Sequence, residues 1–427
     1  MEFSRLIVSW PRKTFLLCIR IFHGNEFHEE GKNLQDNISV YPVKVSSAED
    51  VIKLCAKIGT DSGALSYLVP KANIIHIYAE RVDYRAANFV KQEMLSRGGD
   101  CAVGKHVIDG KTDYSDILII GAEKQIASLT EKMTAMNIWG IPALREKIAG
   151  IMRNIKRGKW EIISPNGRKI ILGRKTRLMA ILNLTPDSFH PESRTDERGI
   201  IERAGKFLDD GAYILDVGAE STRPGASPVS ESDEAGRLLP ALRALRREFP
   251  EALISVDTYK AEIARLSAGE GADIINDISG FNFDSDMAGT IAGLGIPYVL
   301  SHITGTPSDM AGYESHENIL GEMDKYFAEK LSALESAGVK RENVILDPGL
   351  GFGKSAGDNF TVLKNIESLA GFGLPVMIGH SRKRFTGGLS GTLGVTAMMS
   401  GRVSLLRVHD VAGNMEALRV AEGINGA

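Results

Sequence analysis

Residues 178–423 repeat one pattern, in which a short apolar run ends in polar residues and a segment with helical spacing follows. The first repeat is the clearest, because the apolar run 179–182 stops at Asn183 and passes into the loop-forming residues 185–187. Unbroken apolar strands of this kind are typical of a parallel sheet that is buried on both faces. The repeated pattern therefore favours a chain of parallel β/α units.

The repeats predict eight strands, each followed by a helix. The strands are expected at residues 178–184, 213–217, 253–257, 273–276, 298–301, 344–347, 376–379 and 405–408. The first, second, fifth and seventh helices are expected at residues 198–209, 231–248, 319–337 and 391–401. The third, fourth, sixth and eighth helices are expected to end at residues 268, 293, 369 and 423. Eight such units in about 250 residues have the size of a (β/α)8 TIM barrel, an α/β fold whose active sites lie at the carboxyl ends of the strands.

A smaller α/β domain is expected before the barrel, over residues 38–156. Its elements are predicted as a strand at 38–45, a helix from Ser47 to Gly59, a strand at 73–78, a helix at 84–96, a strand at 116–121, a helix at 123–136 and a helix starting at Pro142. A hairpin at 160–163 and 168–172, with Asn166-Gly167 as its turn, is expected to cover the bottom of the barrel. The barrel domain with this hairpin spans 157–427, and residues 1–37 are interpreted as a poorly ordered extension or a start placed too early.

Composition limits the possible partners. The net charge of -3 provides no bulk attraction to nucleic acid or to an anionic membrane, so any anion site must be local. The three cysteines are scattered, which argues against a disulfide framework and favours a reducing cytoplasm. The sequence contains no run of about 18 apolar residues, so no segment is expected to span a membrane.

The polar residues at the eight predicted strand ends share one chemistry. They are Asn183, Glu220 to Gly225, Asp257, Asn276 and Asp277, His302, Asp347, Ser381 to Lys383, and Arg407 with His409 and Asp410. The carboxylates and amides suit the hydrogen-bond donors of a heterocycle, and Arg223, Lys383, Arg407 and His409 suit a phosphate or diphosphate. Asn183 offers a hard oxygen ligand to Mg²⁺, which usually keeps waters and binds through phosphates.

Several of these residues also have a purely structural interpretation. An aspartate after a strand is usually a helix cap or a turn residue, which applies to Asp187, Asp277 and Asp410. His302 and His380 are equally compatible with buried core positions. The glycines 349, 351 and 353 of DPGLGFGK are compatible with a tight turn, and the spacing before Lys354 is not that of a P-loop.

The ordered motifs resemble those of dihydropteroate synthases from about Trp160 to the C-terminus. The motifs are NLTPDSF, ESTRPGA, SVDTYK, INDISG, HITGTP, LDPGLGFGK, SRKRF and RVHDV. The resemblance implies a transferase of folate biosynthesis that condenses 6-hydroxymethyl-7,8-dihydropterin diphosphate with p-aminobenzoate, and members are usually homodimers. The domain at 38–156 looks like an extension that some members carry, and the resemblance implies no role for it.

The resemblance also implies a role for each matching residue. Asp257, Asn276, Asp347 and Lys383 would hold the pterin, and Arg407, His409 and Asn183 would bind diphosphate and Mg²⁺. Thr222, Arg223 and Pro224, on the loop after the second strand, would contact the aminobenzoate. Phe189 and Phe352 would form part of the wall of its pocket. The implied catalytic residues are Asn183, Asp257, Asp347, Lys383, Arg407 and His409.

The sequence departs from the family pattern in several places. His190 to Ser193 replace the usual Ser-Asp-Gly-Gly, so the loop residue that would close the site is unassigned. Ile303 stands where methionine is common, and Arg384 stands where serine often meets the aminobenzoate carboxylate. Two alternatives stay open, a methyltetrahydrofolate-type pterin methyltransferase and a non-catalytic pterin-binding or scaffold protein.

Overall fold

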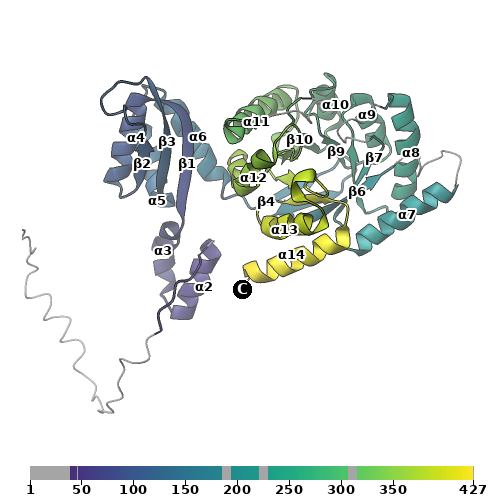
Figure 1. Cartoon of the computed structure of the whole chain (residues 1–427), viewed down its shortest axis with the longest axis horizontal. Coiled ribbons are helices and arrows are strands. Elements are labelled where there is room, and N and C mark those ends of the chain that lie inside the picture. Colours follow the sequence, from purple (N-terminus) through teal and green to yellow (C-terminus); the bar gives the residue numbers. More distant parts are fainter. Residues whose placement is uncertain (1–38, 46, 185–193, 221–228, 306–314, 427) are drawn as a thin grey trace, which may run out of the picture. The chain divides into compact units, whose positions relative to one another are not determined.

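The structure is a computed structural model that describes residues 39–45, 47–184, 194–220, 229–305 and 315–426 (Figure 1). The chain divides into two compact units, Met1–Val69 and Pro70–Ala427. This division falls near residue 70, whereas the domain boundary was expected near residue 157. Residues 70–427 form one unit, and the boundary near 157 stays a prediction.

The first unit contains one well-capped helix, α2 (Ala48–Ile58). Ser47 and Asp50 form a capping box at its start, and Gly59 ends it with a φ of 78°. A 3-10 turn (Ser62–Ala64) and helix α3 (Leu65–Ala72) follow. The strand expected at 38–45 is wrong, since residues 39–45 are unpaired and mostly exposed. Alternation alone does not make a strand where no neighbouring strand completes its hydrogen bonds.

A three-stranded antiparallel sheet of order β1-β3-β2 follows, made of β1 (Ile74–Asp83), β3 (Tyr114–Ala122) and β2 (Asp100–Val103). Its helices are α4 (Tyr84–Ser96), α5 (Glu123–Met133) and α6 (Ile141–Asn154). The chain turns between α4 and β2 at Gly98, where φ is 74°. Buried residues such as Val90, Met94, Ile117 and Ile119 form its core. The predicted α/β character of this region is confirmed.

Eight parallel strands form the barrel in the order β11-β10-β9-β8-β7-β6-β13-β12. They are β6 (Arg177–Asn183), β7 (Ile214–Gly218), β8 (Leu253–Asp257), β9 (Ile274–Asp277), β10 (Tyr298–Ser301), β11 (Val344–Asp347), β12 (Met377–Ile378) and β13 (Leu405–Val408). A parallel bridge between Leu346 and Val376 joins the two ends of this order. The predicted (β/α)8 fold is confirmed, and the seventh strand is shorter than expected.

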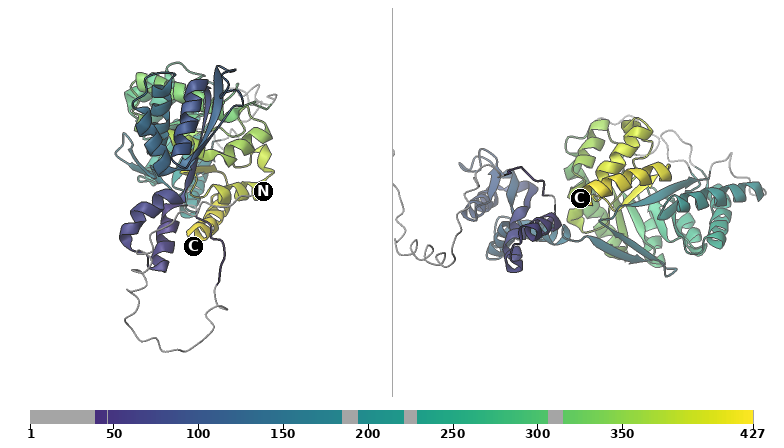
Figure 2. Two further views of the ribbon diagram at one scale, coloured as in Figure 1. Left: turned by 90° about the vertical axis from the view of Figure 1, so that its left-hand side faces the viewer. Right: turned by 90° about the horizontal axis from the view of Figure 1, so that it is seen from below.

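The helices surround the strands in the views of Figure 2. They are α7 (Arg194–Asp209), α8 (Glu231–Glu248), α9 (Ala261–Gly269), α10 (Met287–Leu294), α11 (Ile319–Ser336), α12 (Ala356–Lys364), α13 (Leu389–Met399) and α14 (Val411–Gly426). The sixth helix ends earlier than predicted, and a 3-10 segment (Ile366–Phe372) follows it. The other predicted bounds of these helices are matched to within a few residues.

The predicted hairpin, β4 (Lys159–Ile163) and β5 (Lys169–Gly173), closes the amino-terminal end of the barrel. Its buried Ile162, Ile170 and Leu172 share one apolar cluster with residues near the start of the strands, such as Met179 and Leu405. The expectation that it covers the bottom face is confirmed. The opposite, carboxyl end of the strands is therefore the end that is open to a ligand.

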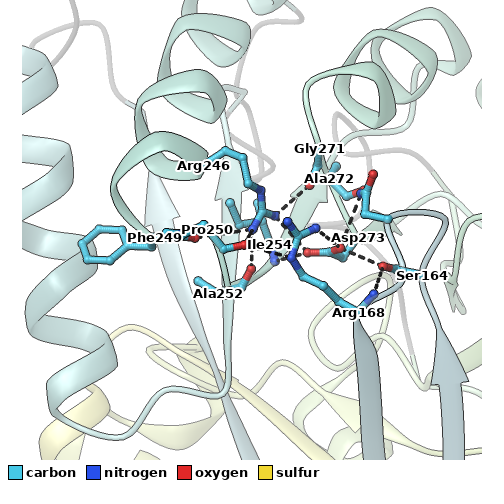
Figure 3. Close-up of polar contacts among 11 residues, drawn as sticks. Ser164, Arg168, Arg246, Phe249, Pro250, Ala252, Ile254, Gly271, Ala272 and Asp273 are labelled. Carbon is cyan, nitrogen blue, oxygen red and sulfur yellow. Dashed lines mark hydrogen bonds and ion pairs between the residues drawn. The ribbon is translucent and has the colours of Figure 1, made fainter.

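Asp273 fixes the tip of this hairpin to the barrel (Figure 3). Its fully buried carboxylate accepts hydrogen bonds from Arg168 Nη1 at 3.1 Å, Arg246 Nη2 at 3.0 Å, Ser164 Oγ at 2.9 Å and Ile254 N at 3.0 Å. Burial lowers the pKa of Arg246, against the attraction of Asp273. Asp273 is buried and bonded to both arginines, so removing its carboxylate would leave the two cations Arg168 and Arg246 without their partner.

Candidate active site

Arg407 on β13 joins two carboxylates from neighbouring strands at the carboxyl end of the barrel. Its Nε donates to Asp216 Oδ2 at 2.6 Å and its Nη2 donates to Asp257 Oδ2 at 2.5 Å. The side chains of Asp216 and Asp257 are 0% and 6% exposed, and that of Arg407 is 16% exposed. The guanidinium fork is thereby held rigidly, with one edge turned to carboxylates.

Asn276 on β9 joins the same group through its amide. Its Nδ2 lies 3.3 Å from Asp216 Oδ2, which orients the side chain. Its Oδ1 is buried and has no hydrogen-bond partner within the described ranges. A buried acceptor without a partner is costly, so Asn276 Oδ1 is suited to an N–H donor of a ligand.

Burial raises the pKa of Asp257 to about 7, although Arg407 opposes this shift. The nearby carboxylates of Asp216 and Asp277 raise it further. Because its pKa is raised, the carboxyl group of Asp257 takes up a proton more readily than an exposed aspartate, and it is suited to a hydrogen bond with a heterocycle.

Asp347 and Lys383 form the second half of the site. Asp347 ends β11, and its Oδ1 accepts a 2.8 Å hydrogen bond from Gly349 N, while burial raises its pKa. Lys383 follows β12, and its Nζ lies 3.9 Å from the ring centroid of Phe352. Burial and the neighbouring Arg407 lower the pKa of Lys383 to about 8, with Asp347 and Asp257 opposing. The charge of Arg407 thus acts on the pKa values of both Asp347 and Lys383. The two halves of the site therefore share one electrostatic environment.

The glycine-rich segment after β11 is a tight turn that no side chain would tolerate. Gly349 and Gly353 both have a φ of 62°, and a Cβ on them would lie 1.9 Å from His302 O and 2.1 Å from Thr304 O. Lys354 Nζ donates to the carbonyls of His302, Gly349 and Phe352 at 3.0–3.2 Å. The structural interpretation of these glycines is confirmed, and the turn positions Phe352 beside Lys383.

Other residues considered for the site are structural. Asp277 accepts from Ser279 N, Phe281 N and the Tyr298 hydroxyl, so it is a turn residue. Asp410 pairs with Arg382 at 2.8 Å. Burial lowers the pKa of both His302 and His380, so these histidines are neutral, and His380 Nε2 lies 2.8 Å from Thr396 Oγ1.

Asn183 and His409 stand at the rim. Asn183 ends β6 and pairs in register with Gly218, which pairs with Asp257, so the three lie side by side on neighbouring strands. His409 Nδ1 lies 3.1 Å from Ser381 Oγ. In the part of the chain that the structure describes, no three histidine, cysteine, aspartate or glutamate side chains converge as a metal site.

The remaining expectations divide into two groups. Asp187, Phe189, His190 to Ser193, Thr222, Arg223 and Pro224 lie outside the described residues. Arg384 is exposed, whereas Ile303 is buried in an apolar cluster with Ile278 and Phe352. Isoleucine therefore fills the space expected of an apolar residue at position 303.

The sequence interpretation missed Asp216. It lies within β7 rather than at its end, and its side chain is fully buried beside Arg407. A carboxylate in the otherwise apolar run ILDVG was a usable signal, because such a group is rarely buried without a cationic partner.

Comparison with known families agrees with this geometry. The family model described as "Pterin binding enzyme" matches residues 179–420. The chain belongs to this family of pterin-binding enzymes. It is 39% identical over 257 residues to the dihydropteroate synthase of Escherichia coli (strain K12), covering 57% of this chain and 90% of that relative. It is 37% identical over 265 residues to that of Synechocystis, covering 59% and 91%.

Solved structures give the same result. The Yersinia pestis dihydropteroate synthase with a sulfonamide drug complex superposes with a TM-score of 0.58 at 32% identity, covering 62% of this chain and 100% of that one. The Xanthomonas albilineans dihydropteroate synthase with 4-aminobenzoic acid gives a TM-score of 0.56 at 33% identity, covering 62% and 99%. The barrel is thus similar along its whole length to dihydropteroate synthases.

A longer match extends beyond the barrel. The probable bifunctional folylpolyglutamate synthase/dihydropteroate synthase of Halobacterium salinarum is 35% identical over 358 residues, covering 80% of this chain and 42% of that relative. The chain therefore spans less than half the length of this relative. Within the described residues, no helix is both long and apolar enough to cross a membrane.

Proposed function

We propose that this chain is a dihydropteroate synthase, which joins 6-hydroxymethyl-7,8-dihydropterin diphosphate to p-aminobenzoate and releases 7,8-dihydropteroate and diphosphate. The observation that carries the proposal is the group in which Arg407 joins Asp216 and Asp257 beside Asn276. This group lies at the carboxyl end of the strands, where barrels of this kind hold their substrates. The matches to dihydropteroate synthases along the barrel support the same reaction.

The pterin ring is assigned to Asp257, Asn276, Asp347 and Lys383. A pterin carries several N–H donors and ring acceptors on one edge, and it needs partners of both kinds. The unpartnered Asn276 Oδ1 offers an acceptor, and the carboxyl groups of Asp257 and Asp347 offer more. Lys383 supplies a donor to a ring acceptor, and its lowered pKa eases the burial of its amine beside an uncharged ring.

The diphosphate is assigned to Arg407, His409 and Asn183. Arg407 has committed Nε and Nη2 to carboxylates, so its Nη1 is the guanidinium nitrogen that an anion would meet. Mg²⁺ fits this rim, because a single amide oxygen of Asn183 with phosphate oxygens and waters suits an ion that keeps its waters. When bound, the ion would neutralise charge on the leaving diphosphate.

The chemical step follows from these roles. Departure of the diphosphate leaves positive charge on the pterin methylene, and the charges of Asp257 and Asp347 stabilise it through the ring. The aromatic amine is neutral at pH 7, so it needs positioning rather than a general base. Water must be kept from the cation, a requirement that the apolar group of Ile278, Ile303 and Phe352 helps to meet.

The arylamine is assigned to the apolar side of the mouth. Phe352 is buried at 8% exposure next to Lys383, and it would form one wall. Phe189, Thr222, Arg223 and Pro224 would complete the pocket, as the family resemblance implies. The Xanthomonas relative was solved with 4-aminobenzoic acid, which supports this substrate class.

A methyltetrahydrofolate-type methyltransferase and a non-catalytic binding protein are the competing functions. A methyltransferase would need the Asp and Asn contacts but no cluster for diphosphate. The basic side chains of Lys383, Arg407 and His409 therefore favour the synthase. A non-catalytic protein would bind the pterin without releasing diphosphate.

We also propose that the barrel forms a homodimer through its outer helices. Four exposed apolar side chains on α13 and α14 support such a contact, namely Leu389, Met398, Val420 and Ile424. Size-exclusion chromatography with light scattering should give twice the chain mass of 46.3 kDa, and a monomer at micromolar concentration would overturn this part of the proposal.

An assay of diphosphate release tests the reaction directly. The chain is incubated with Mg²⁺, the pterin diphosphate and one of several arylamines. Release should depend on the arylamine and should be fastest with p-aminobenzoate. Release with every arylamine at the same slow rate, or none at all, would reject the synthase in favour of hydrolysis or mere binding.

A further inference from the structure

The three residues that precede Lys383 are each tied to segment 409–410, which carries His409. Ser381, the middle one, contacts His409 directly. Its Oγ accepts a 3.2 Å hydrogen bond from His409 N and lies 3.1 Å from His409 Nδ1. Ser381 is only 5% exposed. One buried hydroxyl thus meets both the backbone and the ring of His409.

His380 reaches the same segment through a buried chain of hydrogen bonds. Its Nε2 lies 2.8 Å from Thr396 Oγ1, and Thr396 Oγ1 donates to Asn414 Oδ1 at 2.5 Å. Asn414 Nδ2 then donates to the carbonyl of Asp410 at 2.7 Å. The side chains of His380, Thr396 and Asn414 are fully buried, so water does not compete for these bonds.

Arg382 ties the outer side of the two segments together. Its Nη2 lies 2.8 Å from Asp410 Oδ1, and its Nε lies 3.2 Å from Asp410 Oδ2. Its backbone has a φ of 57°, a left-handed conformation that is disfavoured for residues other than glycine. Such a conformation persists only where the surrounding contacts impose it, and it is typical of functional sites. The contacts therefore fix the chain directly before Lys383.

A serine hydroxyl is suited to hold the ring of His409. It can donate to Nδ1 when the imidazole is neutral and accept from Nδ1 when the imidazole is charged, while it keeps the hydrogen bond from His409 N. The ring therefore keeps one orientation in both protonation states. The χ2 angle of a histidine has only a broad intrinsic preference, so this orientation depends on such a partner.

We propose that Ser381 is a positioning residue for the diphosphate, acting through the ring of His409. The inference rests on the proposed function, which assigns His409 to the diphosphate and Lys383 to the pterin ring. Lys383 lies beside the ring of Phe352, a contact that does not involve the Ser381 hydroxyl. Loss of this hydroxyl should therefore weaken the binding of the diphosphate and spare that of the pterin ring.

Equilibrium binding of two ligands tests this role. The first is 6-hydroxymethyl-7,8-dihydropterin diphosphate with Mg²⁺, and the second is 6-hydroxymethyl-7,8-dihydropterin, which has the same ring without the diphosphate. Ser381→Ala should raise the Kd of the first at least about threefold and that of the second less than about 1.5-fold, as expected when one oriented hydrogen bond is lost. Ser381→Cys has a similar shape but only a weakly hydrogen-bonding thiol, and should give the same result.

A double-mutant cycle shows whether Ser381 acts through His409. In a His409→Ala background, Ser381→Ala should not change the Kd of the diphosphate ligand further. Ser164→Ala is the matched control, because Ser164 is also a buried serine whose Oγ makes two hydrogen bonds, at the opposite end of the barrel. This control should leave both Kd values unchanged.

Three results would overturn the inference, namely an equal rise in both Kd values, an unchanged Kd of the diphosphate ligand in the folded Ser381 variants, or additive effects of Ser381→Ala and His409→Ala. If neither Ser381 variant folds, the hydroxyl is structural and the inference is also overturned. If the unmutated chain binds neither ligand, or if His409→Ala leaves the Kd of the diphosphate ligand unchanged, the proposed function fails instead.

Discussion

Replacing Arg407 by methionine should destabilise the barrel, and more so at alkaline than at acid pH. Arg407 is paired with Asp216 and Asp257, whose side chains are 0% and 6% exposed. Methionine fills similar space but leaves two buried carboxylates without a cation. The prediction therefore concerns the charges rather than a cavity.

The magnitude follows from the cost of breaking a buried pair, about 3–5 kcal/mol when one partner is removed. Protonation can reduce this cost. The pKa of Asp257 is already raised to about 7 in the folded chain, and removal of Arg407, which opposes that rise, would raise it further. The folded variant then binds a proton that the unfolded chain has lost, so its stability falls as the pH rises from about 4 through the folded pKa.

Urea unfolding at pH 8 and pH 5.5 measures the effect. In a background where Trp10 and Trp139 are replaced by phenylalanine, the fluorescence of Trp160 reports the barrel, since Trp160 packs at its base. The loss of unfolding free energy should be about 3–5 kcal/mol at pH 8 and at least about 1 kcal/mol smaller at pH 5.5.

Arg402→Met is the control, because Arg402 pairs with Glu367 at the surface, where such pairs contribute about 0–1 kcal/mol. The reasoning would be refuted if the loss of unfolding free energy in Arg407→Met equalled that in Arg402→Met, or if it were the same at both pH values.

Three further predictions concern single residues. Lys383→Ala should reduce kcat/KM for diphosphate release at least about a hundredfold with the fold retained, since it removes a charged contact to the substrate, and near-normal activity would refute its role. Gly349→Ala should cost more than about 2 kcal/mol in unfolding free energy, because its Cβ would lie 1.9 Å from His302 O at a φ of 62°, and an unchanged melting curve would contradict this. Asp273→Ala should cost about 3–5 kcal/mol by stranding two arginines, with the KM values of the folded fraction unchanged, and a selective change in one KM would contradict its structural role.

The barrel could be predicted because its signal is local and repeated. Strands such as β8 and β11 begin and end where the apolar runs do, since each run is a strand buried on both faces. The candidate residues Asp257, Asn276 and Asp347 followed from one rule of topology, that the carboxyl ends of parallel strands meet at one end of a barrel. The predicted fold thus indicated which residues that are distant in the sequence lie close together in space.

The rest depends on pairings that a single sequence does not reveal. Asp216 was missed because its partner Arg407 lies 191 residues away. A buried charge cluster, in which Lys260 pairs with Glu220 and Glu234, was missed because these glutamates lie 40 and 26 residues away. Residues 39–45 were wrongly predicted as a strand, because a local pattern does not show whether a pairing strand exists.

The identity of the reaction product tests the central claim most directly. The chain is incubated with Mg²⁺, 6-hydroxymethyl-7,8-dihydropterin diphosphate and p-aminobenzoate, and the products are identified by mass spectrometry. One 7,8-dihydropteroate should appear for each diphosphate released, and Asp257→Ala should abolish both. Diphosphate accompanied only by the free hydroxymethyl pterin, or an unaltered pair of substrates, would contradict the account.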